Sequence, residues 1–243
     1  MLEELPVFNK QFSIQGISLH VYDQTTFVAA SDRPLNVISS AILGGDLRRA
    51  RYLINHSVHK DYDGSDPEED LRQVALRLRL GRDVLGMMTA VSVKDTVLYQ
   101  ERQKDLLVAT LCTAGVGNPG VAGLPASEVQ GRYRPGTINI ILMIDGNLTD
   151  AAMVNAVITA TEAKTRALFS AKISLSCGEP VTGTTTDAIV VACTGRGEPL
   201  RYAGTATGLG CLIGRTVYEA VLQGVKTDSR DALSINCERA CLE

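Results

Sequence analysis

The chain has 243 residues, and its composition, 45% hydrophobic and 21% charged, is that of a globular protein with a sizeable core. The net charge is −3 at pH 7 and no run of Lys or Arg stands out, which argues against a nucleic-acid partner. The sequence shows neither the basic start and apolar run of a secretory signal nor about 18 successive apolar residues to span a membrane, so we expect a cytoplasmic protein without a membrane partner.

The first third of the chain reads mainly as β-strand. Ile17–Tyr22 and Thr26–Ala30 are rich in β-branched and aromatic side chains, and Asp23-Gln24 between them is typical of a turn. The apolar run Leu35–Leu43 follows and ends at Gly44-Gly45, a pair that indicates a break in regular structure.

Two helices are predicted next. Asp46 can accept hydrogen bonds from the first backbone amides of a helix over Leu47–Ile54. After a polar stretch, Leu71–Leu80 repeats apolar residues at helical spacing, and Gly81 ends the pattern.

Short apolar runs in the middle of the chain predict further strands. They span Val84–Val93, Leu106–Ala114, Thr137–Ile144 and Ala188–Cys193, and most are bounded by Gly, Asp or Pro. The glycine-rich segment Gly115–Gly136 is longer than most loops of compact domains, which favours a functional loop.

The clearest helix spans Asn147–Leu168, with Thr149 or Asp150 as its N-cap. At about 100° per residue, one face collects apolar side chains and is predicted to be buried. That face consists of Val154, Val157, Ile158, Thr161 and Leu168. A last helix is predicted over about Gly210–Gly224. Because strands and helices do not alternate strictly, we expect an α+β fold: a mixed β-sheet with packed helices, forming a single compact domain over residues 1–243.

Polar side chains gather where several apolar runs begin or end, and sites tend to form at such places. The clusters are Ser39-Ser40, Gly117-Asn118, Gly136-Thr137-Ile138-Asn139 and Gly183-Thr184-Thr185-Thr186-Asp187. The hydroxyls and carboxylate of the last cluster suit binding of a polar ligand or activation of a nucleophile. They equally suit a turn in which Thr and Asp satisfy local backbone groups.

The long helix adds Glu162 and Lys164 to these candidates. Glu162 lies about 80° around the helix from Val154 and Lys164 about 280°, at opposite edges of the apolar face. The two side chains therefore cannot readily enter one small pocket. The alternative for both is a solvated position at the flank of the helix.

A metal or disulfide role is not indicated. The six cysteines are scattered without a Cys-x-x-Cys pair, and structural or incidental roles fit a reducing cytosol. His56 and His59 would lie one turn apart in a helix, but no third ligand of a known motif follows. We expect no metal and no cofactor.

A set of short blocks occurs in a recognisable order over roughly Val37–Val225. The blocks are Ser39–Gly45, Lys60–Asp63, Gly86–Ala90, Thr113–Asn118, Gly136–Ile140, Ala160–Thr165, Gly183–Asp187 and Tyr202–Thr205. Together they resemble the adenosylcobinamide amidohydrolase family, with the blocks that begin at Gly136 and Ala160 the most specific.

The resemblance implies an enzyme of corrinoid salvage. Members hydrolyse the amide between a corrin side chain and aminopropanol in adenosylcobinamide and release adenosylcobyric acid, so the corrinoid is the substrate. Two alternatives stay open: a corrinoid-binding protein without catalysis, and an amidohydrolase of the same fold with another substrate. The absence of an Asp-x-His-x-x-Gly motif counts against a cobalt-coordinating carrier. The oligomeric state is also open, and a homo-oligomer is compatible with the sequence.

Amide hydrolysis needs an activated water or nucleophile and donors for the developing oxyanion. No Ser-His-Asp set is apparent, so we predict a carboxylate mechanism with Glu162 as general base and Asp187 as its alternative or orienting partner. Asn118, Asn139 and Thr185 are predicted to hold the carbonyl and the aminopropanol hydroxyl, and a threonine nucleophile within residues 184–186 is the competing mechanism. The predicted substrate contacts also include Ser39, Ser40, Thr137, Lys164, Thr184 and Thr186.

Overall fold

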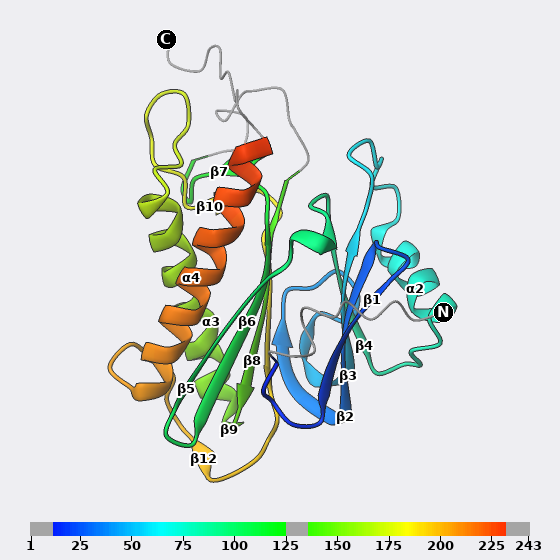
Figure 1. Ribbon diagram of the computed structural model, residues 1–243, viewed down its shortest axis with the longest axis vertical. Coiled ribbons are helices and arrows are strands. Elements are labelled where there is room, and N and C mark those ends of the chain that lie inside the picture. The colour runs from blue at the N-terminus through cyan, green and yellow to red at the C-terminus, as the bar shows by residue number, and fades with distance from the viewer. Residues whose placement is uncertain (1–11, 125–135, 232–243) are drawn as a thin grey trace.

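The computed structural model describes residues 12–124 and 136–231. Figure 1 shows the arrangement of its helices and strands. In chain order the elements are β1 (Ile17–Tyr22), β2 (Thr26–Ser39), β3 (Asp46–Ser57), α2 (Pro67–Arg77), β4 (Val84–Thr89), the 3-10 turn η1 (Val93–Asp95), β5 (Val97–Gln103), β6 (Leu106–Ala114), β7 (Pro119–Gly120), β8 (Ile138–Asp145), β9 (Asn147–Leu148), α3 (Asp150–Ser170), β10 (Gly183–Thr184), β11 (Ala188–Cys193), β12 (Pro199–Leu200) and α4 (Gly208–Asp231).

Eight of these strands form one mixed sheet in the order β4-β3-β2-β11-β8-β6-β5, with β1 paired to β2. The pairs β3–β4 and β8–β11 are parallel, and the other pairs of this sheet are antiparallel. Two short pairs, β7–β10 and β9–β12, lie outside it. The α+β fold with a mixed sheet, predicted from the sequence, is confirmed.

The sheet folds over on itself, so that its two halves face each other. The long strand β2 changes register between Ala30 and Leu35, and such irregularities bend a strand and increase its twist. As a result, Leu53 of β3, Met87 of β4 and Ile141 of β8 are buried in one cluster between the two halves.

Helices cover the two outer faces of the folded sheet (Figure 1). The helices α3 and α4 pack on the half made by β5, β6, β8 and β11, where Thr110 of β6 donates a hydrogen bond to Thr216 of α4 at 3.0 Å. Helix α2 packs against β3 and β4 at the other side. The described residues thus form one compact domain of four layers.

The buried face of α3 is not the one predicted. Val154 and Ile158 are 48% and 51% exposed, and Thr161 is also exposed, whereas only Leu168 of the predicted face is fully buried. The helix instead buries a row of small side chains, roughly half a turn away, which lets α3 approach α4 and the sheet closely. That row contains Ala152, Ala156, Ala160, Ala163 and Ala167. A prediction that looks for large apolar residues along a helix does not find a buried face made of alanines.

The predicted helix over Leu47–Ile54 is also wrong, because these residues lie in β3. Gly44 has a φ of +68° and a Cβ at Gly45 would lie 2.3 Å from the Ala41 carbonyl oxygen, so the pair forms a tight turn between antiparallel strands. The backbone groups of β3 then pair with β2 on one side and β4 on the other. This pairing outweighs the helix propensity of the Leu, Arg and Ala residues in the segment.

The other predicted elements differ mainly at their ends. Helix α2 begins before its apolar pattern because Asp66 accepts a hydrogen bond from the Glu69 amide at 3.1 Å and Pro67 starts the first turn. The predicted strand Val84–Val93 ends at Thr89, and the polar edge strand β5 was not predicted. Within the predicted loop Gly115–Gly136, residues 125–135 lie outside the described part. Among residues 12–124 and 136–231, none of the helices has the length and hydropathy of a membrane span.

Candidate active site

Three of the four predicted polar clusters come together at the end of the sheet where β8 and β11 begin, and the fourth, Ser39-Ser40, lies beside the start of β11 at the end of β2. The strands β8 and β11 are parallel, with Asn139 opposite Ala188, so the residues that precede them lie side by side. The small pair β7–β10 holds Gly183 against Gly120 and brings the segment after β6 to the same place. The fold therefore joins residues 117–118, 136–139 and 183–187.

The centre of this end of the sheet is an ion pair between Lys164 of α3 and Asp187. Their side chains are only 13% and 17% exposed. The Asp187 carboxylate also accepts hydrogen bonds from the hydroxyl of Thr184 and, at 3.1 Å, from the backbone amide of Ile138. The carboxylate therefore has three hydrogen-bond donors around it, which hold it in one orientation beside the backbone.

Gly183 makes room for this ion pair. A Cβ at that position would lie 2.5 Å from the Asp187 Oδ2 and 2.7 Å from the Lys164 Nζ, closer than side chains approach. The glycine that opens the threonine run thus lets the carboxylate and the ammonium meet directly in front of the backbone.

Asn118 anchors the other two threonines. Its side-chain Nδ2 donates to the Thr185 hydroxyl at 2.9 Å and to the Thr186 hydroxyl at 3.3 Å, and its backbone carbonyl accepts from the Thr185 backbone amide at 3.1 Å. The Thr186 hydroxyl donates in turn to the Gly136 carbonyl at 3.2 Å. The Oδ1 of Asn118 is buried and has no hydrogen-bond partner among the described residues.

A pocket of about 430 Å³ opens beside the ion pair. It lies between α3, β10 and the segment that follows β7. Of the residues predicted from the sequence, Lys164, Thr184, Thr185 and Asp187 line it. Some of the predicted site residues therefore line the pocket, and the others lie behind it or elsewhere in the fold.

Asn139 and Thr137 lie behind the pocket, in the protein core. Asn139 is 1% exposed, and its Nδ2 already donates to Asn55 Oδ1 at 2.8 Å and to the Met88 carbonyl at 2.7 Å. Asn55 donates onward to Thr113 at 3.0 Å. The Thr137 hydroxyl bonds to Asn139 and to the Thr186 carbonyl, so this network joins β8 to β3, β4 and β6.

Ser39 and Ser40 connect β2 to β11. The Ser39 hydroxyl donates to the Ile189 carbonyl at 3.0 Å, and the Ser40 hydroxyl accepts from the Ile189 amide at 3.1 Å. Neither serine lines the pocket beside the ion pair.

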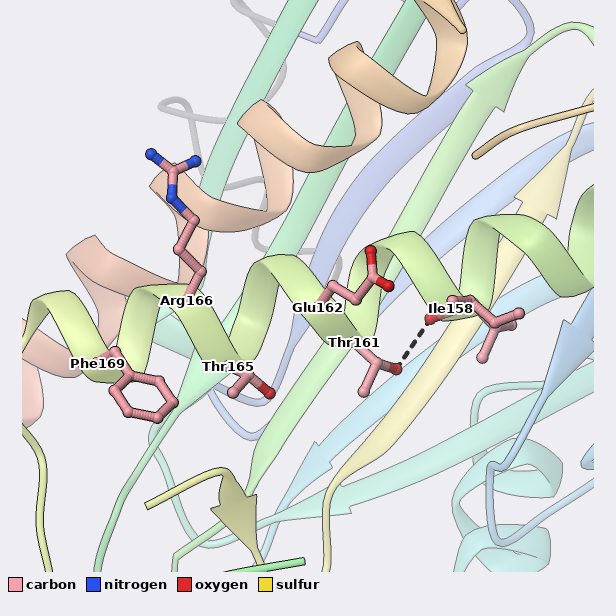
Figure 2. Close-up of a pocket in the computed structure, with 7 residues that line it drawn as sticks. Ile158, Thr161, Glu162, Thr165, Arg166 and Phe169 are labelled. Atoms are coloured by element: carbon pink, nitrogen blue, oxygen red, sulfur yellow. Dashed lines mark hydrogen bonds between the residues drawn. The ribbon is translucent and has the colours of Figure 1, made fainter. Parts of the chain in front are cut away.

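Glu162 lies on the outer side of α3, away from Asp187. It is exposed, makes no hydrogen bond or ion pair within the described ranges, and lines a shallow groove along the helix. Figure 2 shows Glu162 and Arg166 projecting to one side of α3, whereas Thr161, Thr165 and Phe169 project to the other. The structure thus keeps Glu162 and Lys164 in different hollows, as the helical spacing predicted.

Two other reactive groups do not contribute to the pocket. Burial raises the pKa of the Cys112 thiol, and the nearby Asp187 carboxylate raises it further against an opposing effect of Lys164, so no thiolate forms near neutral pH. His59 is exposed, and its Nδ1 lies 3.3 Å from the Asp61 carboxylate. Within residues 12–124 and 136–231, no three His, Cys, Asp or Glu side chains group as metal ligands would.

Thr161, Thr165 and Thr182 also line the pocket, and Asn55 and Thr113 are the buried partners behind it, but none of the five was among the predicted site residues. The spacing of Thr161 and Thr165 around Lys164 offered a signal, because residues three and four apart share a helix side. The partners of Asn139 come from strands far along the chain, and only the fold brings them together.

Comparison with known proteins matches most of this chain to one described family. The family model described as adenosylcobinamide amidohydrolase matches residues 11–232. An adenosylcobinamide amidohydrolase of Methanosarcina mazei is 33% identical over 216 residues, covering 85% of this chain and 94% of the relative. Another, of Halobacterium salinarum, is 41% identical over 133 residues, 52% of this chain and 53% of that protein. Among solved structures, the PH0078 protein of Pyrococcus horikoshii OT3 aligns with a TM-score of 0.41 and 11% identity over 86% of this chain and 82% of that one.

Proposed function

This chain belongs to the adenosylcobinamide amidohydrolase family, and from that membership we propose that it hydrolyses the amide between the corrin side chain and aminopropanol in adenosylcobinamide. The products are adenosylcobyric acid and aminopropanol. The match over residues 11–232 is the observation that carries the proposal, because it includes every element around the pocket.

The contacts at the pocket support a candidate nucleophile for amide hydrolysis. The Thr184 hydroxyl donates a hydrogen bond to Oδ1 of Asp187, and Lys164 donates to Oδ2 of the same carboxylate. A hydroxyl next to a fixed carboxylate is the arrangement of an activated nucleophile. Of the three threonines in the run, Thr184 alone bonds Asp187 within the described residues, so we favour it as nucleophile.

The reaction then runs in two halves. The Thr184 oxygen bonds to the amide carbon while its proton passes to Asp187, and the C–N bond breaks as the departing aminopropanol nitrogen takes that proton. Water then attacks the resulting ester, which restores the Thr184 hydroxyl and leaves the corrin side chain as a carboxylate. Lys164 holds Asp187 in place, and its ammonium offsets the negative charge that develops on the amide carbonyl oxygen.

Glu162 stays a prediction as general base, although its position does not favour it. A base must come within hydrogen-bond reach of the proton that it removes. Glu162 lies across α3 from the threonine run, so a water held by Glu162 would not meet an amide bound beside Thr184.

The proposal is tested by incubating the pure protein with adenosylcobinamide and analysing the products by mass spectrometry. We expect adenosylcobyric acid and aminopropanol in equal amounts. A protein that binds the corrinoid but releases no aminopropanol at any pH would be a binding protein, and release of amine from other amides alone would mean a different substrate.

We further infer that the reaction needs no metal ion or cofactor and takes place in the cytoplasm. The four cysteines of the described part, Cys112, Cys177, Cys193 and Cys211, are free thiols, which supports a reducing compartment. Activity should survive exhaustive chelation. Loss of activity that added Zn²⁺ restores would contradict this inference.

A further inference from the structure

The outer face of α3 carries apolar side chains that the protein leaves in solvent. Val154, Ile158 and Phe169 are each about half exposed, at 48%, 51% and 51%. At about 100° per residue the three lie on one side of the helix, where they form a stripe that Thr161 and Thr165 interrupt between Ile158 and Phe169. Exposed apolar stripes of this kind mark binding surfaces more often than isolated apolar residues do.

Ile158 and Phe169 of this stripe, together with Val157, line a shallow groove of about 700 Å³ that adjoins the active-site pocket. Thr161 and Thr165 line both hollows. In Figure 2 these two threonines project to the same side of α3 as Phe169. A ligand can therefore pass from the groove into the pocket without crossing the helix.

The pocket is too small for the whole substrate. Drug-sized ligands already fill cavities of about 300–1,000 Å³, and the pocket measures about 430 Å³. Adenosylcobinamide contains a corrin macrocycle, its amide side chains and an adenosyl group, which together are far larger than such ligands. Only the arm that ends in aminopropanol fits beside the ion pair, and the ring must rest on surface next to the pocket.

We propose that the apolar groove on α3 is the surface on which the corrin ring lies while its aminopropanol arm reaches over Thr161 and Thr165 to Thr184. This inference rests on the proposed function. Ile158 and Phe169 pack against the apolar macrocycle, as flat apolar ligands pack on aliphatic and aromatic side chains.

The polar rim of the groove suits the amide groups that surround a corrin ring. Arg166 donates to amide carbonyls and Glu162 accepts from amide nitrogens. The guanidinium of Arg166 already lies over the Tyr218 ring, with Cζ 4.4 Å from the ring centroid, so it is oriented before the substrate arrives. This gives Glu162 a binding role at the rim in place of a chemical one.

A second copy of the chain is the competing occupant of the stripe. The variants Ile158→Ser and Phe169→Ala distinguish the two occupants, because they remove apolar surface from the stripe without touching the ion pair. Leu76→Ser is the matched control, because Leu76 is 68% exposed on the remote helix α2. The ligand for the binding measurement is adenosylcobyric acid, which keeps the ring, lacks the aminopropanol arm and is not turned over.

We expect each stripe variant to weaken the affinity for adenosylcobyric acid, read by equilibrium dialysis and the visible absorbance of the corrin, by about tenfold. The KM for adenosylcobinamide should rise in parallel while kcat at saturation stays within about twofold, and Leu76→Ser should change neither. Unchanged affinity in both stripe variants of an active enzyme would overturn the inference. So would a wild-type oligomer in sedimentation velocity that these variants dissociate.

Failure of the proposed function would be seen separately. If the wild type binds adenosylcobinamide but releases no aminopropanol, the hydrolysis proposal falls, and the same variants still decide whether the ring lies on α3. Weakened corrinoid affinity would then support the groove as its binding surface, and unchanged affinity would reject it.

Discussion

Two polar networks lie next to each other at the same end of the folded sheet, and they are built differently. The inner network of Asn55, Thr113 and Asn139 is almost fully buried, and its members are bonded to one another and to backbone. The outer network of Lys164, Asp187 and Thr184 faces a pocket and keeps part of its surface open.

Access to the pocket therefore distinguishes residues with a structural role from residues with a catalytic role more clearly than residue type does. An amide whose donors are already hydrogen-bonded within the core cannot also bind a substrate. It stabilises the fold where the two halves of the sheet meet. A hydroxyl and a carboxylate that meet at a pocket can exchange a proton with a ligand. The inner network should therefore govern stability and the outer network turnover.

The largest expected effect is on turnover in the outer network. Thr184→Val keeps the shape of the side chain and removes the hydroxyl, so kcat should fall by at least about 10³-fold. Thr184→Ser should retain part of the activity. Thr185→Val and Thr186→Val are the matched controls, and aminopropanol release at saturating substrate is the readout. If Thr185→Val is the variant that loses activity instead, the nucleophile is Thr185, as the sequence also allowed.

Gly183 offers a way to disturb the same network without removing any polar group. In Gly183→Ala the new Cβ would meet Asp187 and Lys164, so the ion pair must shift, and kcat should fall by roughly tenfold or more. Gly214→Ala is the control, because a Cβ there meets no atom within 4 Å, and in the helix α4 it should stabilise slightly. Equal kinetics in the two variants would mean that the ion pair does not position the nucleophile.

The inner network should respond in stability. Asn139→Ala leaves the Asn55 Oδ1 and the Met88 carbonyl without their donor, and it should lower the free energy of unfolding by roughly 2–3 kcal/mol in urea titrations. The folded fraction should keep kcat within about threefold of wild type. Loss of kcat with unchanged stability would return Asn139 to the substrate-binding role predicted from the sequence.

The smallest effect concerns His56, which neighbours Asn55 on β3 but belongs to neither network. Burial lowers the pKa of His56 below its ordinary value of 6.5, and the nearby Arg77 lowers it further against a smaller effect of Asp70. The unfolded chain then binds a proton more readily, so the contribution of His56 to stability is present above about pH 6.5 and is lost as the pH falls through the lower folded-state pKa. His56→Gln should flatten this part of the stability profile, and an unchanged profile would show that other groups set the acid limit.

Local patterns in the sequence predicted most of the fold. β1, β6 and β11 match their predicted ranges, since short apolar runs bounded by turn residues indicate strands regardless of what lies beside them. The segment of β3 could not be predicted, because its Leu, Arg and Ala residues favour a helix and only the strands on both sides make it extended.

The candidate site was predicted in composition but not in arrangement. Asp187, Lys164 and the threonine run were all identified, but their contact depends on the parallel pairing of β8 with β11 and on the rotation of α3 about its axis. That rotation follows from a row of alanines, which a search for large apolar residues does not find. Glu162 was favoured for the same reason, since the predicted buried face placed it beside the core.

The most direct test compares Asp187→Asn with Glu162→Gln, because the account assigns the chemistry to one carboxylate and a binding position to the other. The measurement is the rate of aminopropanol release from saturating adenosylcobinamide, with the melting temperature of each variant as the check on folding. The account predicts a fall of at least about 10²-fold for Asp187→Asn and a rate within about threefold of wild type for Glu162→Gln. A nearly normal Asp187→Asn beside an inactive Glu162→Gln, both folded, would contradict it.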